Sequence, residues 1–307
     1  MTADILRTPD SRFARLPGFP FAPHYLENLA DFEGLRLHYV DEAPTEGTGA
    51  PVALCLHGQP TWSYLYRRMI PPLKAAGYRV VAPDLFGFGR SDKPTDSDFY
   101  SFDTHRATLW HFIEALDLKR ITLVCQDWGG ILGLTLPMAM PERFERLIAM
   151  NTALTTGDFD IGQGFRDWRA YNRSRPDLQV GKLLGRACPH LHANEAAAYD
   201  APYPDASYKE GVRRFPELVP VNIDDSGATI ARSAREWWET EWDGRAVIAV
   251  GMRDPVMGAP AMRRLQKIIR GRPPMLELED AGHFVQEWGE RVVAGALSHF
   301  GEGPQAG

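Results

Sequence analysis

The chain has 307 residues, 44% hydrophobic and 24% charged, enough for one large α/β domain with a substantial insertion or for two domains. Its formal net charge is −6 and it has no cluster of lysines and arginines, which argues against nucleic acid as a partner. No apolar run approaches the roughly 18 residues that a membrane span requires, so the sequence also predicts no membrane partner.

The N-terminal sequence predicts a protein that stays in the cytoplasm. Met1-Thr2-Ala3 is followed by Asp4, an acid that comes before any apolar core of a signal peptide could form. A cytoplasmic location is therefore expected.

The three cysteines are consistent with this location. Cys55, Cys125 and Cys188 show no paired spacing, which fits a reducing compartment better than a disulfide framework. Cys188, His190 and His192 lie close together in the sequence, but no second pair of ligands at a zinc-like spacing accompanies them. We therefore predict no bound metal.

Scattered prolines and glycines up to about residue 25 predict an irregular segment over the core, and alternating strands and helices follow. Strands are expected at 25–29, 35–41, 51–56, 78–82, 120–125 and 146–150, and helices at 62–76, 101–116 and after residue 127. Alternation of this kind implies parallel strands that are joined by right-handed crossovers.

The alternation stops between about residues 151 and 233, where the sequence is rich in glycine, proline and aromatic residues and shows no clear strand. It then resumes: strands are expected at 245–250 and 275–278, and helices at 259–269 and 287–300. We predict an α/β core domain made of residues 1–151 and 233–307, with a helical cap inserted at residues 152–232.

One junction between a strand and a helix carries an unusual polar residue, Asp127. The apolar run Ile121–Cys125 leads into it, and Gly129 and Gly130 open the next apolar stretch. This small-x-nucleophile-x-small pattern is typical of a nucleophile elbow, in which esterases place serine. Taken alone, Asp127 could equally be the N-cap of a helix.

Two later residues favour a catalytic role for Asp127. Asp254 and His283 each follow a predicted strand. Loops after the carboxyl ends of parallel strands converge on one crevice. Nucleophile, acid and histidine then stand in the chain order of an α/β-hydrolase fold, with a mostly parallel central sheet flanked by helices.

The loop His57-Gly58-Gln59-Pro60 follows the strand expected beside the elbow. It could be only a tight turn that opens a helix. In a catalytic site, the backbone N–H of Gln59 would join that of Trp128 in an oxyanion hole.

A carboxylate nucleophile is already ionised at neutral pH and can displace a leaving group from a saturated carbon. The resulting ester on Asp127 would be hydrolysed by water that His283 activates, while Asp254 orients the imidazole. Such a reaction needs no cofactor. Either a halide or the oxygen of an epoxide could be the leaving group.

The leaving group determines which donors the site needs. A halide suits indole N–H groups, which only donate. Trp128 is next to the nucleophile, and Trp168 is the candidate from the cap. An epoxide needs proton donors instead, and the available cap tyrosines are Tyr171, Tyr199, Tyr203 and Tyr208. The residues alone leave both reactions open.

These motifs resemble those of the haloalkane dehalogenases, in the subfamily whose catalytic acid follows the strand after the cap. The motifs that carry the resemblance are His57–Arg67, Gln126–Gly130 and Ala281–Glu287, with the cap stretch Tyr199–Pro216. Other subfamilies place asparagine directly after the His-Gly turn and an acid after the strand before the cap. Gln59 and Asn151 occupy those positions here, although the family most often has glutamate at the first of them.

The resemblance implies hydrolysis of a small, apolar haloalkane to an alcohol, a halide ion and a proton, by a monomer. It also implies an apolar substrate pocket lined by Phe165, Phe215, Pro216 and Val219, each of which could equally serve only to pack the cap. An epoxide hydrolase with the same triad and a ligand-binding protein without turnover are the alternatives.

Overall fold

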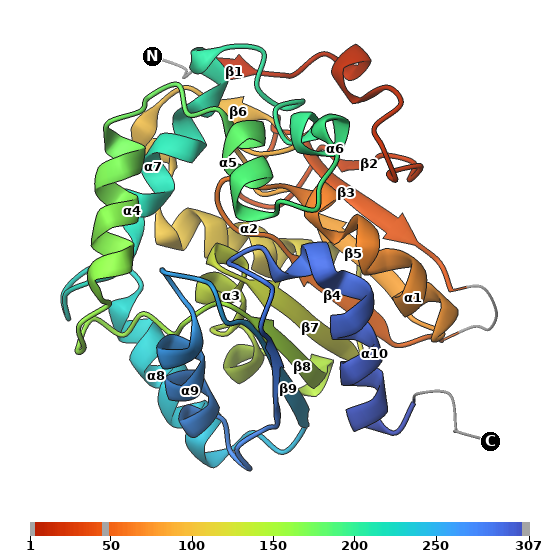
Figure 1. Ribbon diagram of the computed structural model, residues 1–307, viewed down its shortest axis with the longest axis vertical. Coiled ribbons are helices and arrows are strands. Elements are labelled where there is room, and N and C mark those ends of the chain that lie inside the picture. The colour runs from red at the N-terminus through yellow and green to blue at the C-terminus, as the bar shows by residue number, and fades with distance from the viewer. Residues whose placement is uncertain (1–3, 45–48, 303–307) are drawn as a thin grey trace.

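The computed structural model describes residues 4–44 and 49–302 of the chain (Figure 1). The described residues do not include Met1-Thr2-Ala3, on which the expectation of no signal peptide partly rests. They also do not include the two ends of the predicted core domain. Within the described part, the centre is an eight-stranded sheet in the order β10-β9-β8-β7-β4-β5-β3-β2. The strands from β10 to β5 are parallel. At one edge, β3 pairs antiparallel with β5, and β2 pairs antiparallel with β3.

Helices flank this sheet, as predicted. The strands are β2 (His24–Leu26), β3 (Leu37–Glu42), β4 (Val52–Leu56), β5 (Arg79–Pro83), β7 (Ile121–Gln126), β8 (Phe144–Met150), β9 (Arg245–Gly251) and β10 (Met275–Leu278). The core helices are α1 (Ile70–Ala75), α2 (Phe102–Ala115), α3 (Trp128–Gly133), α9 (Ala259–Ile268) and α10 (Gly289–Phe300). Helix α1 packs against α10, and α2 packs against α3.

The central strands read as continuous apolar runs because both faces of the sheet are covered. Every residue of β4 and of β7 is buried. In the register of the sheet, Leu56 pairs with Cys125, and Gln126 pairs with Met150. The loops after β4, β7 and β8 therefore start side by side at one edge of the sheet.

The segment predicted as the cap contains helices α4 (Gln163–Arg173), α5 (Val180–Ala187), α6 (Ala193–Ala198) and α7 (Glu210–Leu218). They gather over one end of the sheet in Figure 1. Helix α8 (Ala228–Thr240) packs against α9, and the predicted boundary between residues 232 and 233 falls inside it. The limits of the cap as a separate unit stay a prediction.

The helix predicted at 62–76 is in fact two pieces, the 3-10 helix η2 (Ser63–Arg68) and the short helix α1. Pro71 and Pro72 explain the break, because neither has an N–H to donate to the preceding turn, whereas both fit the first turn of a new helix. The sequence also missed a small second sheet, in which β1 (Ile5–Leu6) pairs with β6 (Lys93–Pro94).

Two further findings concern the described part of the chain as a whole. None of its helices has the length and apolarity that crossing a membrane would take. Its three cysteines are buried and unpaired with one another.

Candidate active site

Asp127 lies at the sharp turn between β7 and α3. Its backbone has φ 50° and ψ −125°, a conformation that costs a non-glycine residue on the order of 1–3 kcal/mol. Two hydrogen bonds hold the turn: the N–H of Asp127 donates to the carbonyl of Asn151 (3.1 Å), and the hydroxyl of Thr152 donates to the carbonyl of Asp127 (2.8 Å). The strained turn projects the carboxylate away from the sheet.

The glycines after Asp127 are required by close packing. A Cβ atom on Gly129 would lie 1.9 Å from the carbonyl oxygen of Leu56, and one on Gly130 would lie 2.1 Å from Oγ1 of Thr152. Both separations are far below contact distance, so α3 can approach β4 and the loop after β8 only without side chains at these positions. The small residues recognised in the sequence thus have a steric cause.

The carboxylate of Asp127 is nearly buried, with 8% of the residue exposed. The backbone N–H of Gln59 donates to its Oδ1 at 2.8 Å, and Nε2 of His283 lies 3.5 Å from its Oδ2. Gly58 makes this approach possible, because a Cβ there would lie 2.3 Å from Oδ1 of Asp127. Trp128 is the first residue of α3, so its N–H has no acceptor within the helix.

His283 and Asp254 form a close pair, with Nδ1 of the imidazole 2.8 Å from Oδ2 of the carboxylate. Asn151 Nδ2 also donates to Oδ2 (2.7 Å), and the N–H of Val256 donates to Oδ1 (2.7 Å). Burial raises the pKa of Asp254, but His283 and these two donors outweigh it and lower that pKa below its usual value. Asp254 is therefore ionised.

The two carboxylates also act on His283. Burial lowers the pKa of His283, but Asp254 and Asp127 together raise that pKa to about 10. The imidazole is consequently protonated at neutral pH as long as Asp127 carries its charge.

Two hydrogen-bonding neighbours of this set were not predicted as site residues. Asn151 holds Asp254, and Gln126 Nε2 lies 2.9 Å from Nε2 of His283 and 3.2 Å from its carbonyl oxygen. A half-turn of the Gln126 amide would present its oxygen to a protonated ring, so this side chain can serve both protonation states. Their signal in the sequence is their place at the carboxyl ends of β7 and β8, together with the position of Asn151 where other subfamilies place an acid.

A cavity of about 150 Å³ lies above Asp127, at the edge of the sheet beneath the helices of the predicted cap. Its lining is mostly apolar, with Gln59, Asp127 and His283 as the polar members. Of the predicted residues, Trp128, Phe165, Trp168, Pro216 and Val219 line it. The sequence missed Leu183, Pro255, Val256, Met257 and Phe284, which also line it.

Phe215 was predicted to line the pocket, but it lies behind the cavity wall. It is fully buried, and its ring centroid lies 4.8 Å from that of Trp128 and 4.6 Å from those of His105 and Phe88. Successive residues of a helix point about 100° apart, so Pro216 and Phe215 face different sides of α7. Phe215 therefore packs against the Trp128 indole and does not line the cavity.

Known proteins share this fold and resemble the chain in sequence. The family model for the alpha/beta hydrolase fold matches residues 51–290. A haloalkane dehalogenase from Psychrobacter cryohalolentis is 46% identical over 302 residues, which cover 96% of this chain and 97% of that protein. Haloalkane dehalogenase 1 from Mycobacterium tuberculosis is 46% identical over 290 residues, or 92% of this chain and 94% of its own.

The chain belongs to the haloalkane dehalogenase family. The α/β-hydrolase fold and the family predicted from the motifs are both confirmed. The solved structure of the haloalkane dehalogenase DpaA from Paraglaciecola agarilytica NO2, which is tetrameric, superposes with a TM-score of 0.92 at 48% identity and covers 96% of this chain and 98% of DpaA.

The structure shows which groups the side chain and the backbone of Gln59 contact. Its side-chain Nε2 donates to the carbonyl of Val212 in α7 at 2.8 Å, so a neutral side chain joins the turn after β4 to that helix. With glutamine at this position, the backbone N–H of residue 59 still donates to the carboxylate of Asp127.

Proposed function

We propose that this protein hydrolyses small haloalkanes to an alcohol, a halide ion and a proton. One observation carries the proposal: a carboxylate, Asp127, lies at the polar end of an apolar cavity, with the Gln59 N–H on one oxygen and the His283–Asp254 pair beside the other. Asp127, Asp254 and His283 are the catalytic residues in this proposal.

In the first step, an oxygen of Asp127 attacks the carbon that bears the halogen. The new C–O bond forms as the carbon–halogen bond breaks, and the bonding electrons leave with the halide. This produces a neutral alkyl ester on Asp127 and one halide ion. Protonated His283 does not impede this step, because the nucleophile is already ionised.

In the second step, water attacks the carbonyl carbon of the ester. Esterification removes the negative charge of Asp127, which is one of the two charges that raise the pKa of His283, so that pKa falls. His283 then releases its proton to solvent, and the neutral imidazole can accept a proton from the attacking water. The backbone N–H groups of Gln59 and Trp128 stabilise the oxyanion. Collapse of the intermediate breaks the bond between the carbonyl carbon and the alkyl oxygen, which takes the hydroxyl proton of the intermediate and leaves as the alcohol. The Asp127 carboxylate is restored, and His283 is again protonated as it was before the reaction.

The halide is held by the indole N–H groups of Trp128 and Trp168. Both residues line the cavity, Trp128 from α3 and Trp168 from α4. Indoles donate without accepting, so they suit a weakly basic anion in an apolar site. Phe165, Pro216 and Val219 contact the alkyl part of the substrate in this proposal.

Trp168→Phe is expected to weaken bromide binding about tenfold or more, since it removes a donor to a charged ligand worth about 1.5–3 kcal/mol. The dissociation constant is measured from quenching of the remaining tryptophan fluorescence. Trp237→Phe is the control, because this half-buried indole packs on Trp238 (centroids 5.2 Å apart) and does not line the cavity. Equal bromide affinity in both variants would remove Trp168 from the halide site.

The positions of the cap tyrosines disfavour the alternative epoxide hydrolase. The hydroxyl of Tyr199 donates to Glu287, and that of Tyr203 donates to the carbonyl of Pro60. Of the four candidate tyrosines, all within the described residues, none lines the cavity above Asp127.

A direct assay separates the candidate functions. Halide release from 1-bromobutane and 1,2-dibromoethane is measured beside diol formation from an epoxide of similar size. We expect halide and alcohol but no diol. Diol formation without halide release would favour the epoxide hydrolase, and no turnover of either class would favour a ligand-binding protein.

The remaining parts of the proposal concern the protein's state in the cell. We propose a monomer in the cytoplasm, with no nucleic acid or membrane as partner. Large exposed apolar side chains are few in the described part of the chain: Ile5 and Ile223. Since the related DpaA is tetrameric, light scattering on the purified protein is the deciding measurement.

A further inference from the structure

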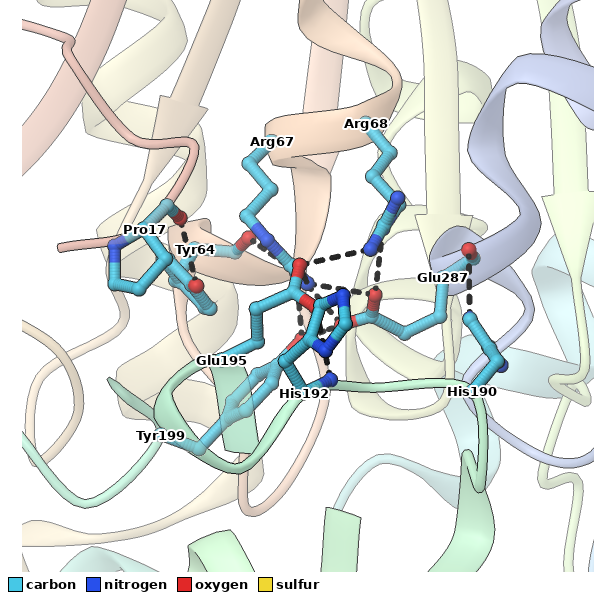
Figure 2. Close-up of polar contacts among 9 residues, drawn as sticks. All are labelled: Pro17, Tyr64, Arg67, Arg68, His190, His192, Glu195, Tyr199 and Glu287. Atoms are coloured by element: carbon cyan, nitrogen blue, oxygen red, sulfur yellow. Dashed lines mark hydrogen bonds and ion pairs between the residues drawn. The ribbon is translucent and has the colours of Figure 1, made fainter. Parts of the chain in front are cut away.

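A buried cluster of ion pairs lies beside the candidate active site and outside its cavity (Figure 2). It consists of Arg67, Arg68, Glu195, Tyr199 and Glu287, and we call it the Glu287 cluster. Two arginines and two glutamates balance in charge. Both Arg67 and Glu287 are only 3% exposed, so their charges depend on one another for compensation.

Glu287 is the centre of the cluster. Arg67 donates to both of its oxygens (2.7 and 2.9 Å), Arg68 Nε donates to Oε2 (3.1 Å), and the hydroxyl of Tyr199 donates to Oε1. Its carboxylate thus receives four hydrogen bonds, and its backbone carbonyl lies 3.3 Å from Nε2 of His190.

The cluster joins three segments that are far apart in the sequence. Arg67 and Arg68 belong to η2, which follows the loop that carries Gln59, and Glu287 belongs to the 3-10 helix η7 (Val285–Trp288). Glu195 belongs to α6 of the predicted cap and accepts from Arg67 (3.1 Å) and Arg68 (2.8 Å). Figure 2 shows these side chains converging from the three segments.

Helix η7 begins two residues after His283, so the two are closely linked along the chain. Gln286 of η7 donates to Oε1 of Gln126 (3.4 Å), and Nε2 of Gln126 in turn lies 2.9 Å from Nε2 of His283. Gly289, which follows η7, packs closely on η2's neighbour Met69, since a Cβ on Gly289 would lie 2.5 Å from Met69 Cγ.

We propose that Glu287 is a positioning residue that holds His283 at the distance from Asp127 which ester hydrolysis requires; this rests on the proposed function. Attack of Asp127 on the substrate does not use His283 as a base, whereas hydrolysis of the ester does. Loosening Glu287 therefore slows hydrolysis more than it slows alkylation. A purely structural role would lower the amount of folded enzyme and leave the ratio of the two rate constants unchanged.

The test is Glu287→Gln, which keeps the size of the side chain but has one acceptor oxygen instead of two and turns an NH₂ group toward the arginines. Alkylation is followed as the rapid burst of halide in single-turnover experiments with 1-bromobutane, and hydrolysis as the decay of the alkyl-enzyme in mass spectra. We expect the ratio of hydrolysis to alkylation rate constants to fall at least tenfold. An unchanged ratio in a folded variant would overturn the proposal.

Glu195→Gln is the matched control, since it removes a carboxylate of the same cluster that does not belong to η7. It should lower the melting temperature and leave the ratio unchanged. An equal fall of the ratio in Glu195→Gln and Glu287→Gln would also overturn the proposal, because any loss from the cluster would then suffice.

If Glu287→Gln does not fold, Arg68→Gln provides the same test. The Arg68 side chain is 32% exposed and supplies one of the four bonds to Glu287, so a folded protein and a threefold fall of the ratio are expected. An unchanged ratio in Arg68→Gln would then contradict the proposal. A wild-type protein that never forms the alkyl-enzyme would instead contradict the proposed function itself.

Discussion

Asp127→Asn is expected to reduce halide release by at least about 10⁴-fold, because a neutral amide is a poor nucleophile. The fold should survive. Asparagine has the same size, and its side-chain oxygen can still accept the N–H of Gln59 that now donates to Oδ1 at 2.8 Å. Halide release is measured with 1-bromobutane, and folding by circular dichroism and thermal melting.

Asp224→Asn is the control for this substitution, since Asp224 is exposed and far along the chain from the elbow. It should retain full activity. Mass spectrometry confirms that residue 127 remains asparagine during the assay. A folded Asp127→Asn variant with wild-type turnover would eliminate Asp127 as the nucleophile.

His283→Gln is expected to separate the two steps. Without a general base, hydrolysis of the ester should slow by about 10²–10⁴-fold, whereas alkylation needs no base. The variant should therefore release one halide per enzyme molecule in a burst and then stop, with its mass increased by one alkyl group. The measurement combines halide detection with mass spectrometry of the intact protein.

The position of the added group completes this prediction. Peptide mapping should find it on the peptide that contains Asp127. Steady turnover by His283→Gln at the wild-type rate would show that His283 is not the base, and an alkyl group on another residue would contradict the assignment of the nucleophile.

Much of the sheet and the order of the candidate catalytic residues could be predicted from the sequence, and the reason is local. Buried parallel strands such as β4 and β7 have uninterrupted apolar runs that end abruptly in polar residues. Since such strands end at a common edge, Asp127, Asp254 and His283 could be expected to meet there, and the distances among their side chains agree with this.

What could not be predicted depends on contacts between distant segments. Phe215 and Pro216 are adjacent and both apolar, and only the packing of α7 shows which of them faces the cavity. The bond between Arg67 and Glu287 joins residues 220 positions apart, and no pattern along the chain indicates it. The sequence shows that Asn151 occupies the position where other subfamilies place an acid. Only the structure shows that it donates a hydrogen bond to Asp254.

The most direct test of the covalent mechanism follows one oxygen atom. With wild-type enzyme in excess over 1-bromobutane in ¹⁸O-labelled water, the first turnover should yield unlabelled butanol, because its oxygen comes from Asp127. The label should appear instead in the carboxylate of Asp127, detected in the peptide that contains it. Labelled butanol in the first turnover, with no label on Asp127, would show that water attacks the carbon directly and would contradict an ester on Asp127.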